Sequence, residues 1–180
     1  VNCTSTVTVN GRTFKNYNDF PADRVGTMSL QNALATSCNT AFISASSKLS
    51  AADLTSAAAS LGVGTDYDAG FPAFYGSVPT AGDSVTKAAD AIGQGEVEAS
   101  PMAMAGLAAS VASGKTVIPW LVEGHQPTSK AAPLTANETA QLQSMMKAVV
   151  TEGSGRGLQG LMVGAKTGTA EYGGGSPPKT

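Results

Sequence analysis

The sequence of 180 residues predicts a mixed α/β fold of the α+β kind. Three observations lead to this expectation. A β-branched segment with an Asn-Gly pair opens the chain, several capped segments carry apolar residues at helical spacing, and an alternating apolar segment near the C-terminus ends at a lysine. The 42% of hydrophobic residues suffice for one core, so a single compact domain is expected.

The segment from Cys3 to Phe20 is predicted to form a small β-ribbon. Polar and apolar β-branched residues alternate from Thr6 to Val9, and Asn10-Gly11 follows them. Asn-Gly is a preferred pair in two-residue hairpin turns, because both positions need a positive φ.

A helical segment is predicted to begin at Ser29. Apolar side chains recur at helical spacing between Leu30 and Ala45, as the buried face of one helix or of two helices in series requires. A break between two helices would fall from Ser37 to Asn39, where three residues of poor helix propensity meet.

The next helix has a clear start and stop. Ser50 and Asp53 form a capping-box pattern, and Gly62 is suited to end the helix in a left-handed conformation. From Gly62 to Gly82 the chain is rich in Gly, Pro, Asp and Tyr, which predicts an irregular loop.

A third helix is predicted after Ser100-Pro101, an N-cap followed by proline at the first helical position, and it should end at Gly114. The residues from Thr116 to Val122 then resemble a short strand. Pro119 would place that strand at a sheet edge or a bulge, since proline lacks the N–H that a central strand donates.

The last predicted helix begins at the capping-box pair Thr135 and Glu138 and stops at Gly153. Beyond it, apolar side chains alternate at Leu161, Val163 and Ala165, which predicts a strand that leads directly into Lys166. A lysine would then stand at the edge of a sheet beside the helices.

Composition excludes several kinds of function. The net charge is -2, and the 11 Lys and Arg residues are scattered, so the basic surface that nucleic acid requires is absent. No apolar run approaches the roughly 20 residues that span a bilayer. The single histidine, His125, and two distant cysteines make no metal-ligand cluster, and no cofactor is expected. Cys3 and Cys38 fit free thiols or one disulfide equally well.

Two short motifs carry the chemistry. Ser37-Cys38-Asn39 is a Ser-x-Asn element, which alone is common by chance. Lys166-Thr167-Gly168 is rarer and continues as Thr169-Ala170-Glu171 at the end of the predicted strand. Acyl transfer between peptides needs a group that returns a proton to the leaving amine and a cation for a terminal carboxylate, and Ser37 and Lys166 are suited to these roles.

Together with a Gly93-Gln94-Gly95 turn and the following Ser100-Pro101 helix start, these motifs stand in a distinctive order. In that order the chain resembles, from about residue 26 to 172, the transpeptidase domain of the monofunctional, high-molecular-weight penicillin-binding proteins. The resemblance implies a β-lactamase/transpeptidase-like fold, with a helical cluster packed on part of an antiparallel sheet.

The chain departs from the family in one respect. The family's nucleophilic Ser-x-x-Lys precedes Ser-x-Asn, whereas the matches here at 84–87, 144–147 and 176–179 all follow Ser37. We therefore expect residues 1–180 to be part of a transpeptidase domain that lacks the nucleophile segment and the closing C-terminal strands and helix, and that is inactive alone. An open sheet edge beside Lys166 predicts association or local disorder over residues 170–180.

The resemblance also implies roles for the site residues. Ser37 would relay a proton to the leaving amine, and Asn39 would hydrogen-bond the substrate amide. Lys166 would anchor the substrate carboxylate and ease deprotonation of Ser37. Substrate would lie along Thr167, Gly168 and Thr169, with the Thr167 and Thr169 hydroxyls directed toward its carboxylate and the backbone N–H of Thr169 forming half of an oxyanion hole. Gln94 is expected to be structural.

The implied function is serine acyl transfer that cross-links peptidoglycan stem peptides ending in D-Ala-D-Ala, with covalent inhibition by β-lactam antibiotics. The resemblance also implies a glycosyltransferase partner, an extracytoplasmic location and a membrane anchor outside this chain. Two alternatives share the fold: a D,D-carboxypeptidase or class D-like β-lactamase, and a non-catalytic sensor of β-lactams or cell wall. Asn39 and the Gly-Gln-Gly turn favour the transpeptidase.

Overall fold

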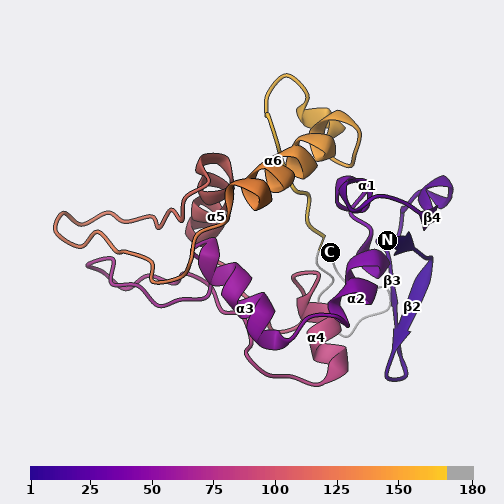
Figure 1. The fold of residues 1–180 in the computed structure, drawn as a ribbon, viewed down its shortest axis with the longest axis horizontal. Coiled ribbons are helices and arrows are strands. Elements are labelled where there is room, and N and C mark those ends of the chain that lie inside the picture. The colour runs from indigo at the N-terminus through magenta and orange to yellow at the C-terminus, as the bar shows by residue number, and fades with distance from the viewer. Residues whose placement is uncertain (170–180) are drawn as a thin grey trace. The chain divides into compact units, whose positions relative to one another are not determined.

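The structure, a computed structural model, describes residues 1–169 (Figure 1). These residues fall into two compact units. The terminal unit joins Val1–Ala45 to the segment that begins at Ser144, and the central unit comprises Ser46–Gln143. The prediction made for residues 170–180 lies outside the described part of the chain.

The terminal unit contains all four strands that the described residues form, in two antiparallel pairs. They are β1 (Asn2–Cys3), β2 (Thr6–Val9), β3 (Arg12–Lys15) and β4 (Gly26–Thr27), with a short 3-10 turn at Ala22–Arg24. The predicted hairpin is confirmed: β2 pairs with β3, and Asn10 and Gly11 have φ values of 45° and 84° in the turn. The second pair joins β1 to β4.

Two short helices follow, α1 (Leu30–Ala35) and α2 (Asn39–Ser46), and they lie in the same unit up to Ala45. The break predicted near Ser37 is therefore confirmed. Their core is small. It consists of the buried residues Cys3, Ala33, Cys38 and Ala41, packed against Phe20, Met28 and Phe42. Cys3 and Cys38 form a disulfide with a Cα–Cα distance of 6.1 Å, which decides the alternative that the sequence left open.

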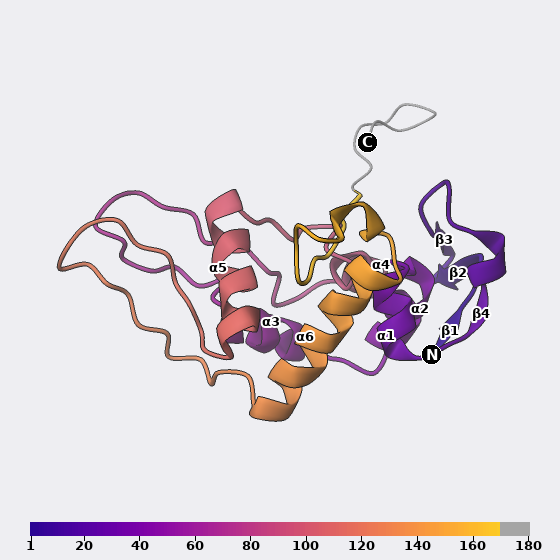
Figure 2. The same cartoon turned by 90° about the horizontal axis from the view of Figure 1, so that it is seen from above.

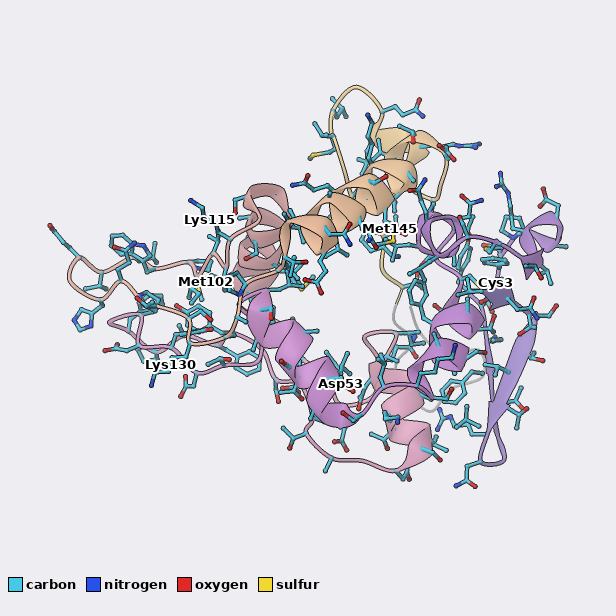
Figure 3. The ribbon with its side chains drawn as sticks, in the orientation of Figure 1. Cys3, Asp53, Met102, Lys115, Lys130 and Met145 are labelled. Atoms are coloured by element: carbon cyan, nitrogen blue, oxygen red, sulfur yellow. A yellow bond between two sulfur atoms is a disulfide. The ribbon has the colours of Figure 1, made fainter. Side chains whose placement is uncertain are left out.

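The central unit holds α3 (Ala51–Ser60), α4 (Ser84–Asp90) and α5 (Pro101–Ser113). The predicted caps of α3 and α5 are confirmed: Asp53, labelled in Figure 3, completes the capping box with Ser50, and Ser100 Oγ accepts from Ala103 N–H. The helix α4 was not predicted. It starts at Asp83, whose carboxylate accepts the backbone N–H groups of Val85 and Thr86 at 2.9 and 2.8 Å.

The helix α6 (Ala136–Thr151) belongs to the central unit up to Gln143 and to the terminal unit from Ser144. Its predicted capping box forms, since Glu138 Oε2 accepts from the Thr135 backbone N–H at 2.8 Å and Glu138 N–H donates to Thr135 Oγ1 at 3.3 Å. A 3-10 turn at Arg156–Leu158 follows.

Two predicted strands are wrong for the described residues. The segment 116–122 is irregular, because Val117 N–H donates to Ser110 Oγ at 2.8 Å and Pro119 has no N–H to donate. The segment 161–169 is also not a strand: Ala165 N–H donates to Met146 O of α6 at 3.1 Å, and Leu161 and Val163 are 78% and 86% exposed. Alternation of apolar residues produces a strand only when another strand accepts its hydrogen bonds, and none of the described residues does so here.

Long loops of the central unit pack against each other. Segments 62–82 and 115–135 run side by side in both views (Figures 1 and 2), and Tyr75 O–H donates to Pro119 O at 2.7 Å. Tyr75, Ala69 and Ile118 form the buried centre of this packing. Gly70 allows the approach, since a Cβ there would lie 2.7 Å from Val122 Cβ.

Candidate active site

Ser37 lies in the turn that ends α1. Its φ of 58° is in the left-handed region, which a residue with a Cβ rarely adopts. Ser37 N–H donates to Leu34 O at 3.1 Å and Cys38 N–H donates to Ala33 O at 2.9 Å. This pair of bonds is the Schellman motif, in which glycine usually holds the position that Ser37 holds here. A serine in this place costs about 1 kcal/mol of backbone strain, so the fold around it must hold it there.

The disulfide provides one such restraint. Cys38, the middle residue of Ser37-Cys38-Asn39, is fully buried and bonded to Cys3, which is also fully buried. Cys3 is labelled in Figure 3. The turn that carries Ser37 is therefore tied covalently to β1.

Buried polar groups provide a second restraint. Asn16, only 6% exposed, accepts the backbone N–H of Thr40 at 3.2 Å and donates to Thr4 O at 2.9 Å. Thr40 Oγ1, fully buried, donates to the same Thr4 carbonyl at 2.8 Å. Because Thr40 is in the first turn of α2, Asn16 satisfies a helix N–H that has no partner within the helix. The residue after β3 thus fixes the start of α2, next to Ser37.

Lys166, in the C-terminal segment of the terminal unit, contacts Ser37 in its N-terminal segment. Its Nζ donates to Ser37 Oγ at 2.9 Å and to the carbonyl oxygen of Thr167 at 2.6 Å. The residue as a whole is exposed, but its ammonium group is partly enclosed by protein, and this burial lowers the pKa of Lys166 from its ordinary 10.5. A cation beside a serine hydroxyl favours the alkoxide and polarises the O–H bond.

The other predicted site residues are less closely joined to this pair. The Asn39 side-chain amide donates to Lys15 O of β3 at 3.3 Å. Thr167 Oγ1 lies 2.7 Å from Ser154 Oγ. Gly168 has no neighbouring atom within 4 Å of an added Cβ, and Thr169 is exposed. Ala170 and Glu171, which continue the motif, lie outside the described residues.

Gln94 belongs to the central unit, in a turn held from inside by Asp90. This aspartate is 6% exposed and accepts Glu96 N–H at 2.9 Å, and a Cβ on Gly95 would lie 2.4 Å from its Oδ1. Gly93, with φ of 73°, lies in the turn after α4 and donates its N–H to Asp90 O at 2.9 Å. Gly95 therefore allows a close approach to Asp90, and the structural role expected for Gln94 stays a prediction.

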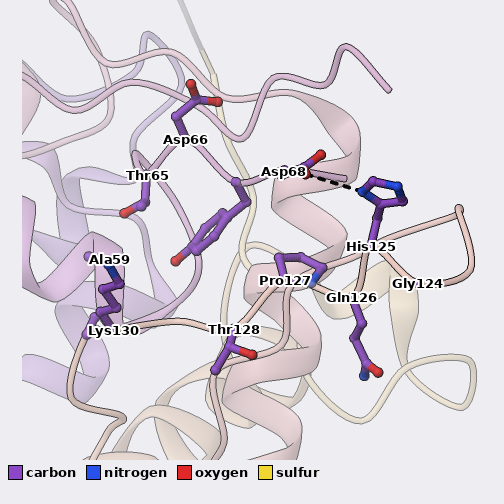
Figure 4. Close-up of a pocket in the computed structure, with 12 residues that line it drawn as sticks. Ala59, Thr65, Asp66, Asp68, Gly124, His125, Gln126, Pro127, Thr128 and Lys130 are labelled. Carbon is purple, nitrogen blue, oxygen red and sulfur yellow. Dashed lines mark hydrogen bonds and ion pairs between the residues drawn. The ribbon is translucent and has the colours of Figure 1, made fainter. Parts of the chain in front are cut away.

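A pocket in the central unit contains His125 (Figure 4). His125 Nδ1 lies 3.2 Å from Asp68 Oδ2, and the Gly70 N–H and His125 together lower the pKa of Asp68. Ser129 Oγ, on the same loop, accepts from Tyr67 O–H at 3.3 Å and from the backbone N–H of Ala131 at 3.1 Å. The His125–Asp68 pair links the two loops. A catalytic triad would also need a serine beside the other ring nitrogen of His125.

Two further features of the described residues bear on function. No group of three or more His, Cys, Asp or Glu side chains among residues 1–169 is placed to hold a metal ion. In the same range no helix combines the length and the apolar character needed to cross a bilayer.

Sequence reasoning missed two residues that contact the Ser37 turn. Asn16 is a lone asparagine after a strand, and Ser154 is a serine in a Gly-Ser-Gly turn. Neither has a distinguishing local pattern, because their partners are 24 and 119 residues away.

A family model for the penicillin-binding protein transpeptidase domain matches residues 1–180. The chain is 29% identical over 175 residues to the peptidoglycan D,D-transpeptidase PbpA of Mycobacterium tuberculosis, which covers 88% of this chain and 35% of that protein. It is 32% identical over 178 residues to PbpA of Mycolicibacterium smegmatis, with 89% and 36% covered. The chain thus spans about a third of the length of these relatives.

Solved structures of penicillin-binding proteins are similar in fold to this chain. Penicillin-binding protein A of M. tuberculosis, as a ceftriaxone acyl-enzyme complex, superposes with a TM-score of 0.80 at 26% identity, over 96% of this chain and 42% of that one. A chain of a peptidoglycan synthase complex that coordinates polymerization and crosslinking superposes with a TM-score of 0.76 at 27% identity, over 97% and 33%. The chain therefore belongs to the penicillin-binding protein transpeptidase family.

Proposed function

We propose that this chain is the part of a peptidoglycan D,D-transpeptidase that supplies the proton relay and the carboxylate anchor of the acyl-transfer site. The observation that carries the proposal is the 2.9 Å contact between Lys166 Nζ and Ser37 Oγ. It joins the two family motifs that the chain contains.

In the proposed reaction, a serine of the full-length protein attacks the carbonyl of the penultimate D-alanine. The serine O–C bond forms as the C–N bond to the terminal D-alanine breaks. The proton lost by the serine reaches the leaving amine through Ser37, whose hydroxyl Lys166 polarises. An acceptor amine then attacks the acyl-serine carbonyl: the new amide C–N bond forms, the ester C–O bond to the serine breaks, and one proton of the amine returns to the serine oxygen through Ser37.

Substrate binding uses the same segment. The Lys166 cation receives the terminal carboxylate, helped by the Thr169 hydroxyl. Thr169 N–H supplies one oxyanion donor, and Gly168 lets the peptide lie against the backbone. Asn39 hydrogen-bonds the substrate amide from the start of α2. A β-lactam follows the same path, with its ring amide in place of the scissile bond.

The nucleophile is proposed to lie N-terminal to residue 1, and further strands and a helix C-terminal to residue 180. Two facts support this: the chain spans 35% of PbpA, and no Ser-x-x-Lys precedes Ser37. We expect the isolated chain not to acylate. The buried Cys3–Cys38 disulfide fits an oxidising, extracytoplasmic location. Relatives in a synthase complex that polymerizes and crosslinks peptidoglycan support a glycosyltransferase partner.

The test is covalent labelling with a fluorescent penicillin, applied to the isolated chain and to the full-length protein, with mass mapping of the adduct. Stable labelling of the full-length protein alone, at a serine N-terminal to Ser37, is the expected result. An adduct that hydrolyses rapidly would favour a D,D-carboxypeptidase or class D-like β-lactamase. Absence of any adduct would favour the non-catalytic sensor.

A further inference from the structure

The turn that follows α6 contacts both halves of the Ser37–Lys166 pair. Gly153 is pressed against the end of α1, because a Cβ on it would lie 2.0 Å from Ala35 O and 2.6 Å from Ala35 C. Among the described glycines this is the closest approach to another backbone segment. The next residue, Ser154, donates its backbone N–H to Ala35 O at 2.9 Å.

This backbone bond completes the C-terminal end of α1. Ala33 O and Leu34 O accept from Cys38 and Ser37 within the Schellman turn, and Ala35 O is left for a partner outside it. Ala35 is 2% exposed, so an unpaired carbonyl there would be costly. The Ser154 N–H supplies the missing donor to Ala35 O. Ala35 lies two residues before Ser37.

The Ser154 side chain extends the link to the Lys166 segment. Ser154 Oγ donates to Ala35 O at 3.3 Å and lies 2.7 Å from Thr167 Oγ1. A serine hydroxyl has one proton, so when Ser154 donates to Ala35 the Thr167 hydroxyl is the donor in the second bond. The chain of bonds then runs from Thr167 through Ser154 to the last carbonyl of α1.

We propose that Ser154 is a positioning residue of the acyl-transfer site, which holds the Lys166-Thr167 segment on the end of α1 and so keeps the Lys166 ammonium on the Ser37 hydroxyl. The inference rests on the function proposed above. It assigns the Thr167 hydroxyl a holding role and leaves the carboxylate to Lys166 and Thr169.

The kinetic consequence is specific. Ser154 touches neither the acyl group nor the carboxylate in this arrangement, so its loss should act on the chemical step through Lys166. In the full-length protein, Ser154→Ala is expected to lower the acylation rate at saturating penicillin by about two- to tenfold, the equivalent of one hydrogen bond. The penicillin concentration at half-saturation should stay unchanged.

Two variants sharpen the experiment. Ser154→Thr keeps the hydroxyl at an exposed position and should restore the rate. Ser144→Ala is the matched control in the same unit, because it removes an exposed hydroxyl that donates to Gln31 Oε1 at 3.0 Å, outside the site. It should leave the rate unchanged.

The outcomes separate the two proposals. If the wild-type protein does not label, the proposed function fails before Ser154 is tested. If the wild-type protein labels while Ser154→Ala changes only the thermal midpoint, or acylates as fast as Ser144→Ala, Ser154 is merely structural and the inference is wrong. A lowered rate that Ser154→Thr does not restore would also overturn it, because the hydroxyl would then not be the cause.

Discussion

Lys166 Nζ and Ser37 Oγ lie 2.9 Å apart although 129 residues separate them in the sequence. The serine is held in a left-handed turn by a disulfide and a buried asparagine, and the lysine is held by a segment bonded to α6. Rigid support on both sides is what the proposed proton relay requires, since a displacement of about 1 Å can cost a large part of the rate.

Replacing Ser37 separates its chemistry from its backbone strain. Ser37→Ala and Ser37→Gly both remove the hydroxyl, so both should lower penicillin acylation by the full-length protein by about 100-fold or more. The two variants should differ in stability. Because φ at this position is 58°, the free energy of unfolding of Ser37→Gly should exceed that of Ser37→Ala by about 1 kcal/mol. Acylation kinetics and urea unfolding check this. Normal acylation by the glycine variant would show that the hydroxyl is not needed.

The pH dependence should report Lys166. Burial lowers its pKa below 10.5, so a reaction that needs the protonated lysine should slow with rising pH before that value. Between the lowered pKa of Lys166 in the folded protein and 10.5, the unfolded chain binds more protons than the folded one. The Lys166 contribution to the free energy of unfolding therefore rises with pH in this range.

Lys166→Arg should remove the alkaline decline, because arginine stays protonated to about pH 12, while the rate at neutral pH falls. Acylation rates measured from about pH 6 to 11 test this, with Lys147→Arg, an exposed lysine on α6, as the matched control. If Lys166→Arg shows the same alkaline decline in rate as the Lys147→Arg control, the decline comes from a group other than Lys166.

Asn16 should matter for stability more than its sequence context suggests. Asn16→Ala leaves the buried Thr40 N–H without its partner, at a cost of about 1–3 kcal/mol in free energy of unfolding. Asn18→Ala, which removes only an exposed contact to Lys15 Nζ, should change it by less than about 0.5 kcal/mol. Equal losses in chemical denaturation would mean that the buried network does not support the turn.

Two glycines in the segment after α6 make a matched pair. An alanine Cβ at Gly153 would overlap Ala35 O, so Gly153→Ala should cost about 1–3 kcal/mol and slow acylation by displacing α1. Gly157 has nothing within 4 Å of an added Cβ, so Gly157→Ala should be near neutral. Thermal midpoints and labelling rates of the two variants distinguish a close approach from a general effect of glycine; similar behaviour of both would contradict the packing described here.

Local signals were read correctly from the sequence. The Asn10-Gly11 turn, the capping boxes at Ser50 and Thr135, and the break at Ser37 each depend on residues within a few positions of one another. Such features are formed by backbone preferences that one segment contains in full.

Features that depend on distant partners were missed or wrong. The alternation at Leu161 and Val163 met no accepting strand among the described residues, and Val117 found a serine hydroxyl instead of a ladder. The Cys3–Cys38 pairing, the cap from Asn16 and the Ser154 contacts all join segments far apart in the chain. The motifs suggested that Ser37 and Lys166 meet, but the distance between them depends on these contacts.

A double-mutant cycle of Ser37→Ala and Lys166→Ala tests the central claim most directly, with penicillin acylation of the full-length protein as the measurement. If Lys166 acts by polarising Ser37, the double variant should acylate no more slowly than the slower single variant, because residues that act as one unit are not additive. If the two losses multiply, the residues act independently and the proposed relay is contradicted.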